Sequence, residues 1–426
     1  MDIRFVINKL GAIKDSKFKF KPLLIFTGDS GLGKSYSAFL AYYFVSFFTN
    51  SKGLREFVEE RLKKEKISMD KNKEGVIFTF RTEDLKRYIN YQAPKFLGYL
   101  VGYEGFEADV SIDFDIPLDV ITVCYRTGEI SIDGTKSVPL IIYYIENSSI
   151  SINVMSEMND VNLLTYLILK RFFLVNIFSK ESDFQTMFLP PARGSIMVAG
   201  TDAMNAIMRI GMYKEFVNDL DYLQSFSLPN NRRSIILIES LKKILGGYLV
   251  NEKGNIFLVL NSKDKIPLSA AASSVKELSP LFLLLQKYSP DKLSVLFEEP
   301  EAHVHPFVQY QVADVIARCV QKKSFFQITT HSDYFLERIN TLIKLHKIRS
   351  HNLNLHTDIV DRASIPSQLM LDPKLVGAYL LDRRPDGSVE IINQDVENGV
   401  PFTTFSRALD LSYNMSSELN DIIEKI

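Results

Sequence analysis

The segment "PLLIFTGDSGLGKS", residues 22–35, constrains the fold of this chain more than any other feature. An apolar run of strand length leads into a glycine-rich turn that fits G-x-x-x-x-G-K-S/T at every defined position, and an apolar, aromatic helix pattern follows. Glycines allow backbone N–H groups to point at phosphate oxygens, and the helix start adds a favourable dipole. The segment therefore predicts a strand–loop–helix unit of an α/β fold that binds a nucleotide.

The residue types in this loop predict ATP and Mg²⁺ as cofactors. The Lys34 ammonium would contact the β- and γ-phosphates, and the Ser35 hydroxyl would ligate the metal. The residues expected to bind the nucleotide are Gly28, Asp29, Ser30, Gly31, Leu32, Gly33, Lys34 and Ser35. The competing interpretation, a glycine-rich turn that binds nothing, does not account for the strand and helix on either side.

A second segment, "LSVLFEEPEAHVHP" at 293–306, runs an apolar strand into adjacent carboxylates. Like charges at the end of a buried strand cost stability unless a cation or a reaction uses them. Ligands bind at the carboxyl ends of parallel strands. We therefore expect Glu298 to hold Mg²⁺ and Glu299 to be the catalytic base that orients the attacking water. The alternative is a solvated Glu-Glu turn.

Histidines follow in two places. The strand pattern "FFQI" ends in "TTHS", so His331 is a candidate to donate a hydrogen bond to the γ-phosphate, although a lone histidine is more often structural. His303 and His305 flank a helix start before Pro306 and are interpreted as a turn and interface element. A metal pair is the alternative for these two, but the sequence offers it no further ligand.

The segment 266–288 predicts a helix with two interpretations of its start. Ser274 and Glu277 fit an S-x-x-E capping box ahead of an apolar helix. Alternatively, the free N–H groups at this helix start, with Ser273 and Ser274, form a second phosphate site for nucleotide bound to another subunit.

Three further polar residues are candidates without a settled role. Arg193, in "FLPPARGSI", is an arginine on a proline-fixed loop that could reach a phosphate, or an ordinary surface residue. Gln92 and Gln185 are both candidates for a lid glutamine above the nucleotide.

Length and composition bound the remaining choices. A chain of 426 residues exceeds one ordinary core, and its formal net charge of −1 does not indicate a dedicated nucleic-acid coat. The two cysteines lie far apart, outside any metal-ligand pattern, which favours a reducing compartment. The apolar segments at 38–48 and 163–178 are shorter than a membrane span, so we expect buried helices, no membrane and a cytoplasmic location.

We expect three regions along the chain. Residues 1–150 form a lobe with the phosphate loop and an antiparallel β subdomain, indicated by period-2 alternation from 106 to 146. Residues 151–250 form a mainly helical insertion. Residues 251–426 form a C-terminal lobe with parallel-sheet units, short strands and two terminal helices.

The order of motifs resembles the ABC-type ATPase heads of the SMC and RecF proteins. It is most similar to the OLD-like family, through "VINKLGAI", "GDSGLGKS" and "EEPEAHVHP", over about residues 1–50 and 180–340. The resemblance implies an α/β ABC-ATPase head with a mixed or parallel sheet, Walker A at Lys34 and Ser35, the Walker B metal position at Glu298, the base at Glu299 and a switch histidine at His331. It implies a signature serine at Ser273 or Ser274. That segment lacks the usual neighbouring glycine, and Ser269 is an alternative.

The same resemblance implies partners. ATP sandwiched between two heads would make the chain a homo-oligomer, a dimer or higher. No Asp-x-Asp follows His331, as a TOPRIM nuclease domain would need, so we expect a separate effector protein such as a nuclease. The expected function is a slow ATPase switch or sensor in antiphage defence, resembling the ATPase subunits of PARIS or Septu systems, with a phage-encoded trigger. The alternatives are a RecF-like or SMC-like DNA-binding repair ATPase and a scaffold that binds ATP without hydrolysing it.

Overall fold

A nine-stranded sheet forms the centre of the protein. The computed structural model describes residues 2–50, 52–63, 74–132, 136–155, 160–199, 201–224, 234–252, 254–363, 365–401 and 403–423. The strand order is β5-β1-β2-β16-β15-β3-β14-β13-β9. The strands are β1 (Ile3–Leu10), β2 (Ile13–Lys19), β3 (Leu23–Gly28), β5 (Ala108–Phe114), β9 (Gln185–Leu189), β13 (Leu293–Glu298), β14 (Phe325–Thr329), β15 (Val376–Arg383) and β16 (Val389–Gln394).

The five strands β15, β3, β14, β13 and β9 are mutually parallel, so their carboxyl ends share one edge of the sheet. Strand β3 is buried throughout and its side chains alternate between two cores: Leu24 and Phe26 in one, Leu23 and Ile25 in the other. Helix α1 (Lys34–Thr49) covers the face of the sheet that carries Leu24 and Phe26, called the first face below. Burial on both faces explains why these strands are continuous apolar runs rather than alternating ones.

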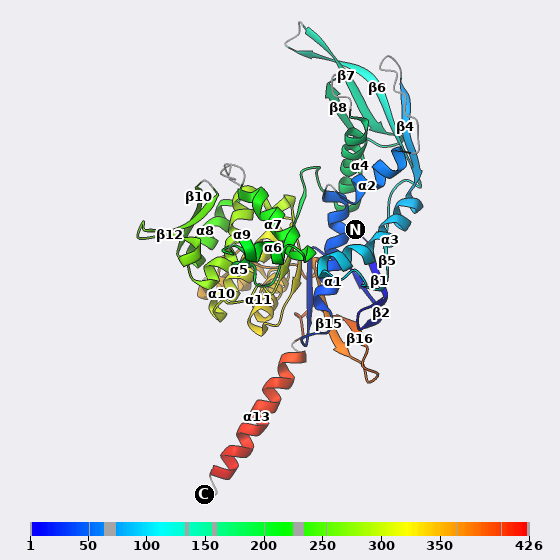
Figure 1. The fold of residues 1–426 in the computed structure, drawn as a ribbon. Helices are drawn as coiled ribbons and strands as arrows, with labels where there is room; N and C mark the ends of the chain where they lie inside the picture. The colour runs from blue at the N-terminus through cyan, green and yellow to red at the C-terminus, as the bar shows by residue number, and fades with distance from the viewer. Residues whose placement is uncertain are drawn as a thin grey trace.

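A second lobe projects from the first face of the sheet (Figure 1). Its antiparallel sheet has the order β4-β6-β7-β8. The lobe contains β4 (Gly75–Arg81), β6 (Val120–Ile132), β7 (Lys136–Ile145), β8 (Ser151–Met155), α2 (Leu54–Leu62) and α4 (Val161–Phe178), and α3 (Thr82–Val101) runs beside α1. The antiparallel subdomain predicted from 106–146 is confirmed for β6 and β7. Strand β5, however, pairs with β1 in the main sheet.

Helix α4 is long and apolar enough to cross a membrane, by length and composition only. In the structure 61% of this segment is buried. It packs against α2 and β7, as a core helix does.

The opposite face of the main sheet carries the helices of the chain's second half (Figure 1). They are α5 (Arg193–Ile196), α6 (Thr201–Ile207), α7 (Gly211–Gln224), α8 (Ile235–Leu245), α9 (Ser273–Lys287), α10 (Pro306–Gln321), α11 (Asp333–His351) and α12 (Leu353–Arg362). A small antiparallel sheet of β10 (Gly247–Glu252), β11 (Asn255–Leu260) and β12 (Lys265–Pro267) lies beside α8. The prediction of parallel-sheet units from Asn255 onward is therefore wrong for β11 and β12. These two strands are antiparallel neighbours connected by a short turn.

The C-terminal segment differs from the expected pair of helices. One helix, α13 (Thr403–Ile423), follows β16 and stands away from the rest of the molecule (Figure 1). The region 151–250, expected to be mainly helical, contains the helices α4 to α8, together with β8 in the projecting sheet and β9 in the main sheet. The α/β class, with a phosphate loop on a mixed sheet and an antiparallel subdomain, is confirmed.

Candidate nucleotide site

The phosphate loop connects the end of β3 to the start of α1. Gly28, Gly31 and Gly33 all have positive φ, at 127°, 77° and 97°. A Cβ on Gly28 would lie 2.3 Å from the carbonyl oxygen of Leu381 on the neighbouring strand, whereas a Cβ on Gly31 would meet nothing within 4 Å. Glycine is thus required at Gly28 both by its backbone conformation and by the close approach of β15.

This difference predicts unequal effects of two alanine substitutions. Gly28→Ala should lower the free energy of unfolding by about 3 kcal/mol or more, because backbone strain and overpacking add. Gly31→Ala is the matched control, with strain alone and a loss of about 1 kcal/mol. Thermal unfolding followed by circular dichroism measures both. Equal midpoints for the two variants would contradict the close approach to β15.

Lys34 lies over its own loop. Its Nζ donates hydrogen bonds to the carbonyl oxygens of Gly28, at 2.9 Å, and Asp29, at 2.8 Å. Burial lowers the pKa of Lys34 to about 8, and nearby carboxylates, Glu299 first among them, oppose that shift. A buried ammonium held beside the loop N–H groups is a cation positioned for phosphate oxygens.

Glu298 ends β13 inside the protein, with 2% of its surface exposed. Burial raises its pKa to about 7, while the nearby hydroxyls of Ser35 and Thr329 lower the pKa and so favour its ionised form. The effect of Ser35 brings together two residues that are distant in the sequence, and both were predicted to hold Mg²⁺. An oxygen donor pair of hydroxyl and buried carboxylate suits Mg²⁺, so the side chains present fit this ion.

Glu299 turns the chain sharply after β13. Its φ is 44°, in the left-handed region, and its N–H donates to the carbonyl oxygen of Thr329 at 3.0 Å. Backbone strain of this kind costs about 1–3 kcal/mol and gathers at functional sites. The turn directs the carboxylate toward Lys34, whose pKa it raises.

Strand β14 lies between β3, which carries the phosphate loop, and β13. His331 follows β14, and its backbone N–H donates to Glu301 Oε1 at 2.6 Å. Desolvation and then the charge of Lys34 lower the pKa of His331, whereas Glu299 raises it. Three strand ends therefore bring Lys34, Glu299 and His331 together.

The resemblance implies a D-loop at residues 300–303, but it gave Glu301, the third carboxylate of "EEPE", no individual role. Its side chain accepts from the His331 N–H, and burial raises its pKa. Glu301 Oε2 is buried without a hydrogen-bond partner among the described residues. The signal that could have found it is the unusual density of carboxylates after one buried strand.

Neither interpretation of Arg193, an arm that reaches a phosphate or an ordinary surface residue, matches the structure. The side chain is fully buried, and its guanidinium donates to the carbonyl oxygens of Glu298, at 2.8 Å, and Glu299, at 3.2 Å. It also donates to the carbonyl oxygen of Glu277 at 3.0 Å and lies 3.4 Å from that residue's carboxylate. Arg193 thus ties the carboxyl end of β13 to helix α9.

The structure also corrects the capping box. Helix α9 begins at Ser273 with Ala272 at the N-cap and no side-chain cap, and Glu277 is buried against Arg193. Ser273 is exposed and Ser274 is half-buried at the open helix start. Ser269 lies just upstream, exposed, in the 3-10 helix Leu268–Ala270.

Neither candidate lid glutamine lies at the phosphate loop. Gln185 pairs with Leu293 at the amino end of β9, the opposite edge of the sheet. Gln92, on α3, lines the same cavity as Gln185 at that edge. His305 caps α10 by accepting from the N–H of Phe307 at 3.3 Å, which matches the predicted turn. Within the described ranges, no three His, Cys, Asp or Glu side chains gather as a metal site.

The pKa values of Glu298 and Lys34 predict a pH window for nucleotide binding. The Glu298 carboxylate is ionised above a pKa of about 7, and the Lys34 ammonium is charged below a pKa of about 8. We expect the tightest binding of ATP with Mg²⁺ between these values, with affinity falling up to about tenfold per pH unit on either side. Titrations at about pH 6, 7.5 and 9 measure this. Glu298→Gln has no carboxyl to protonate at this position, so the fall in ATP affinity between about pH 7.5 and 6 should be smaller than in the wild type. The same pH dependence of affinity in the variant and the wild type would contradict the role of Glu298.

Comparisons with known proteins agree with a nucleotide site. A family model described as an AAA ATPase domain matches residues 201–336, about a third of the chain. This match supports ATP hydrolysis as the general activity. No curated protein matches the sequence.

Solved structures of ATPase heads align with the chain at low scores. The SMC head domain from Thermotoga maritima has 12% identity and a TM-score of 0.37, covering 93% of this chain and 100% of its own. An SMC head domain from Pyrococcus furiosus, bound to the C-terminal domain of ScpA, has 13% identity and a TM-score of 0.37, covering 97% and 98%. An ATP-binding cassette of an ABC transporter in its ADP conformation has 11% identity and a TM-score of 0.33, covering 94% and 93%. Scores of this size do not establish a common fold.

Proposed function

We propose that this protein binds ATP with Mg²⁺ and hydrolyses it slowly, as an ATPase of the SMC and ABC type. The observation that carries the proposal is the meeting of Lys34 and Ser35 with Glu298 and Glu299 at the carboxyl edge of the sheet. A phosphate loop alone binds nucleotide. A buried carboxylate on the loop serine, with a second one directly after it, adds the parts that hydrolysis needs.

The residues divide the chemistry between them. The loop N–H groups and Lys34 would hold the phosphates, and Ser35 with Glu298 would hold Mg²⁺, which supplies charge neutralisation at the phosphates when bound. Glu299 would orient a water and take its proton. His331, held through its backbone by Glu301, would donate to the γ-phosphate and respond to its loss.

We further propose that the active form is a homo-oligomer with ATP between two heads. The open N-terminus of α9 supports this, since Ser273 is exposed and the first turn lacks a side-chain cap. Free N–H groups at a helix start attract phosphate. Arg193 joins this helix to the end of β13 in the same chain, so nucleotide contacts at α9 and at Glu299 would be coupled.

The biological role we propose is a cytoplasmic switch in antiphage defence that controls a separate effector, such as a nuclease, in response to a phage-encoded trigger. This role rests on the resemblance of the "EEPEAHVHP" segment to the OLD-like family. The alternative is a DNA-binding repair ATPase. A groove at the amino edge of the sheet favours that alternative, since Lys19, Lys21, Lys347 and Lys374 line it. The carboxylates of Asp372, Asp395 and Glu397 line the same groove and offset this charge.

A pull-down distinguishes the two roles. The variant Glu299→Gln would be purified from its native host with ATP and Mg²⁺, next to Lys34→Ala as a control that should not form the ATP-bound state. A stoichiometric protein partner recovered with the first variant and lost with the second supports the switch. Nuclease-sensitive nucleic acid without a partner supports the repair role instead.

A further inference from the structure

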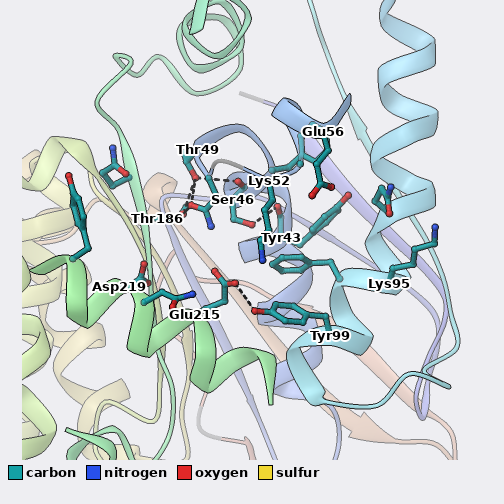
Figure 2. Close-up of a pocket in the computed structure, with 18 residues that line it drawn as sticks. Tyr43, Ser46, Thr49, Lys52, Glu56, Lys95, Tyr99, Thr186, Glu215 and Asp219 are labelled. Atoms are coloured by element: carbon teal, nitrogen blue, oxygen red, sulfur yellow. Dashed lines mark hydrogen bonds between the residues drawn. The ribbon is translucent and has the colours of Figure 1, made fainter. Parts of the chain in front are cut away.

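A cavity of about 490 Å³ lies at the C-terminal half of α1, the end away from the phosphate loop. It is half open to solvent and is lined by α1, the start of α2, α3, the start of β9 and α7, and Figure 2 shows the side chains that line it. Its volume is within the range of small-molecule sites. The ATPase chemistry uses none of its side chains. Its walls come from both hydrophobic cores, because Phe47 belongs to one and α7 packs with the other.

Two carboxylates one helical turn apart on α7 face this cavity (Figure 2). Glu215 is 9% exposed, and its Oε1 accepts from the Tyr99 hydroxyl at 2.9 Å. Asp219 Oδ2 accepts from the N–H of Phe188 at 3.1 Å. In the part of the chain that the structure describes, neither carboxylate has an ion pair, and the second oxygen of each has no hydrogen-bond donor.

These carboxylates lack the cation that buried acids normally require. Burial raises the pKa of Asp219 well above its ordinary value, and the charge of Glu215 adds to the shift. A bound cation would remove this cost by favouring the ionised form. The cavity therefore gains most from a positively charged ligand that donates hydrogen bonds.

The opposite wall of the cavity is aromatic. Tyr43 and Phe47 of α1 and Phe96 and Tyr99 of α3 line it, and Tyr222 of α7 adds a further ring on the side of the carboxylates. The ammonium of Lys52 lies 5.4 Å from the centre of the Tyr99 ring, so one cation of the protein itself already occupies an aromatic face here. Aromatic faces attract ammonium and guanidinium groups.

We propose that this cavity binds a small organic cation with several N–H donors, an amine or a guanidine. Its charged end would donate to the free oxygens of Glu215 and Asp219, and its carbon chain would lie against the aromatic wall. Thr186, Gln185 and Asn218 add neutral polar groups for a second nitrogen. An anion placed beside α7 would meet both carboxylates, whereas Lys52 and Lys95 line the cavity beside α1 and α3. The site is independent of the ATPase activity.

Isothermal titration of the full chain with spermidine, agmatine and adenosine tests this proposal. Spermidine represents amines, agmatine carries a guanidinium and adenosine is a neutral planar ligand. We expect saturable binding of spermidine or agmatine, and the stronger of the two identifies the preferred head group. No saturable binding of either at millimolar concentration, or binding of adenosine alone, would overturn the proposal.

Three variants and a control locate the bound cation. Glu215→Gln and Asp219→Asn should each weaken binding about tenfold or more, because each removes a charge-assisted hydrogen bond. Lys52→Gln should strengthen binding severalfold, because it removes a competing ammonium; this gain cannot arise from misfolding. The control Glu104→Gln changes an exposed carboxylate that does not line the cavity, and affinity should stay unchanged. Equal effects of Glu104→Gln and Glu215→Gln would assign the binding to surface charge.

Discussion

Replacing Glu299 by glutamine should lower ATP hydrolysis by about 10²- to 10⁴-fold while the dissociation constant for ATP changes little. The amide keeps the size and polarity of the side chain at the strained turn but cannot take a proton from water. Glu298 and Ser35 are unchanged and stay close to each other, so the place for Mg²⁺ is intact. Phosphate release and ATP binding, measured on the same preparation, separate the two effects.

The neighbouring substitution Glu298→Gln is the matched control. It removes the Glu298 carboxylate, which lies near the Ser35 hydroxyl, so the Mg²⁺ dependence of ATP binding should weaken. A loss of hydrolysis with retained Mg²⁺-dependent binding should thus be specific to Glu299→Gln. Equal hydrolysis rates in the wild type and Glu299→Gln would contradict the assignment of Glu299 as the catalytic base.

Arg193→Met should destabilise the protein by about 3–5 kcal/mol, the cost of breaking a buried ion pair by removing one partner. Glu277 would be left without its cation, and the carbonyl oxygens of Glu298 and Glu299 would lose a shared donor. The chain contains no tryptophan, so circular dichroism is the suitable measure of unfolding.

Two variants test the cause of this loss. Arg193→Lys keeps the charge, but a single ammonium cannot donate to the four carbonyl groups of Pro190, Glu277, Glu298 and Glu299 as the planar guanidinium does, so a smaller loss is expected. Arg209→Met changes an exposed arginine and should alter stability by less than about 0.5 kcal/mol. If Arg193→Met unfolds at the same denaturant concentration as Arg209→Met, the contacts of the buried Arg193 side chain do not stabilise the protein.

The sequence was most informative where function depends on a short continuous segment. The phosphate loop needs glycines at fixed spacing between a strand and a helix, and Gly28, Lys34 and Ser35 lie as that pattern predicts. Glu298 and Glu299 were found in the same way, because carboxylates at the end of an apolar strand are unusual.

Features that depend on contacts between distant segments were not predictable. Nothing local to β14 indicates that it lies between β3 and β13. Arg193 follows two prolines, which indicates a loop correctly, but its complete burial depends on α9 and β13, some 80 to 105 residues away. Gln185 was a candidate by residue type alone, and the parallel register of β9 with β13 places it at the wrong edge of the sheet.

The local signal at the start of α9 was also misleading. The S-x-x-E spacing of Ser274 and Glu277 satisfies the pattern of a capping box. The helix starts earlier, at Ser273, and Glu277 pairs with the buried Arg193 and caps nothing. Tertiary electrostatics here overrides a local preference.

Phosphate release from ATP by the purified wild-type chain, with and without Mg²⁺ and next to Lys34→Ala, tests the central claim most directly. We predict phosphate release that requires Mg²⁺ and that falls to background in Lys34→Ala. The variant lacks the ammonium that lies over the phosphate loop in the wild type. Equal release by the wild type and Lys34→Ala, or no ATP binding by the wild type, would contradict the assignment of this site as an ATPase centre.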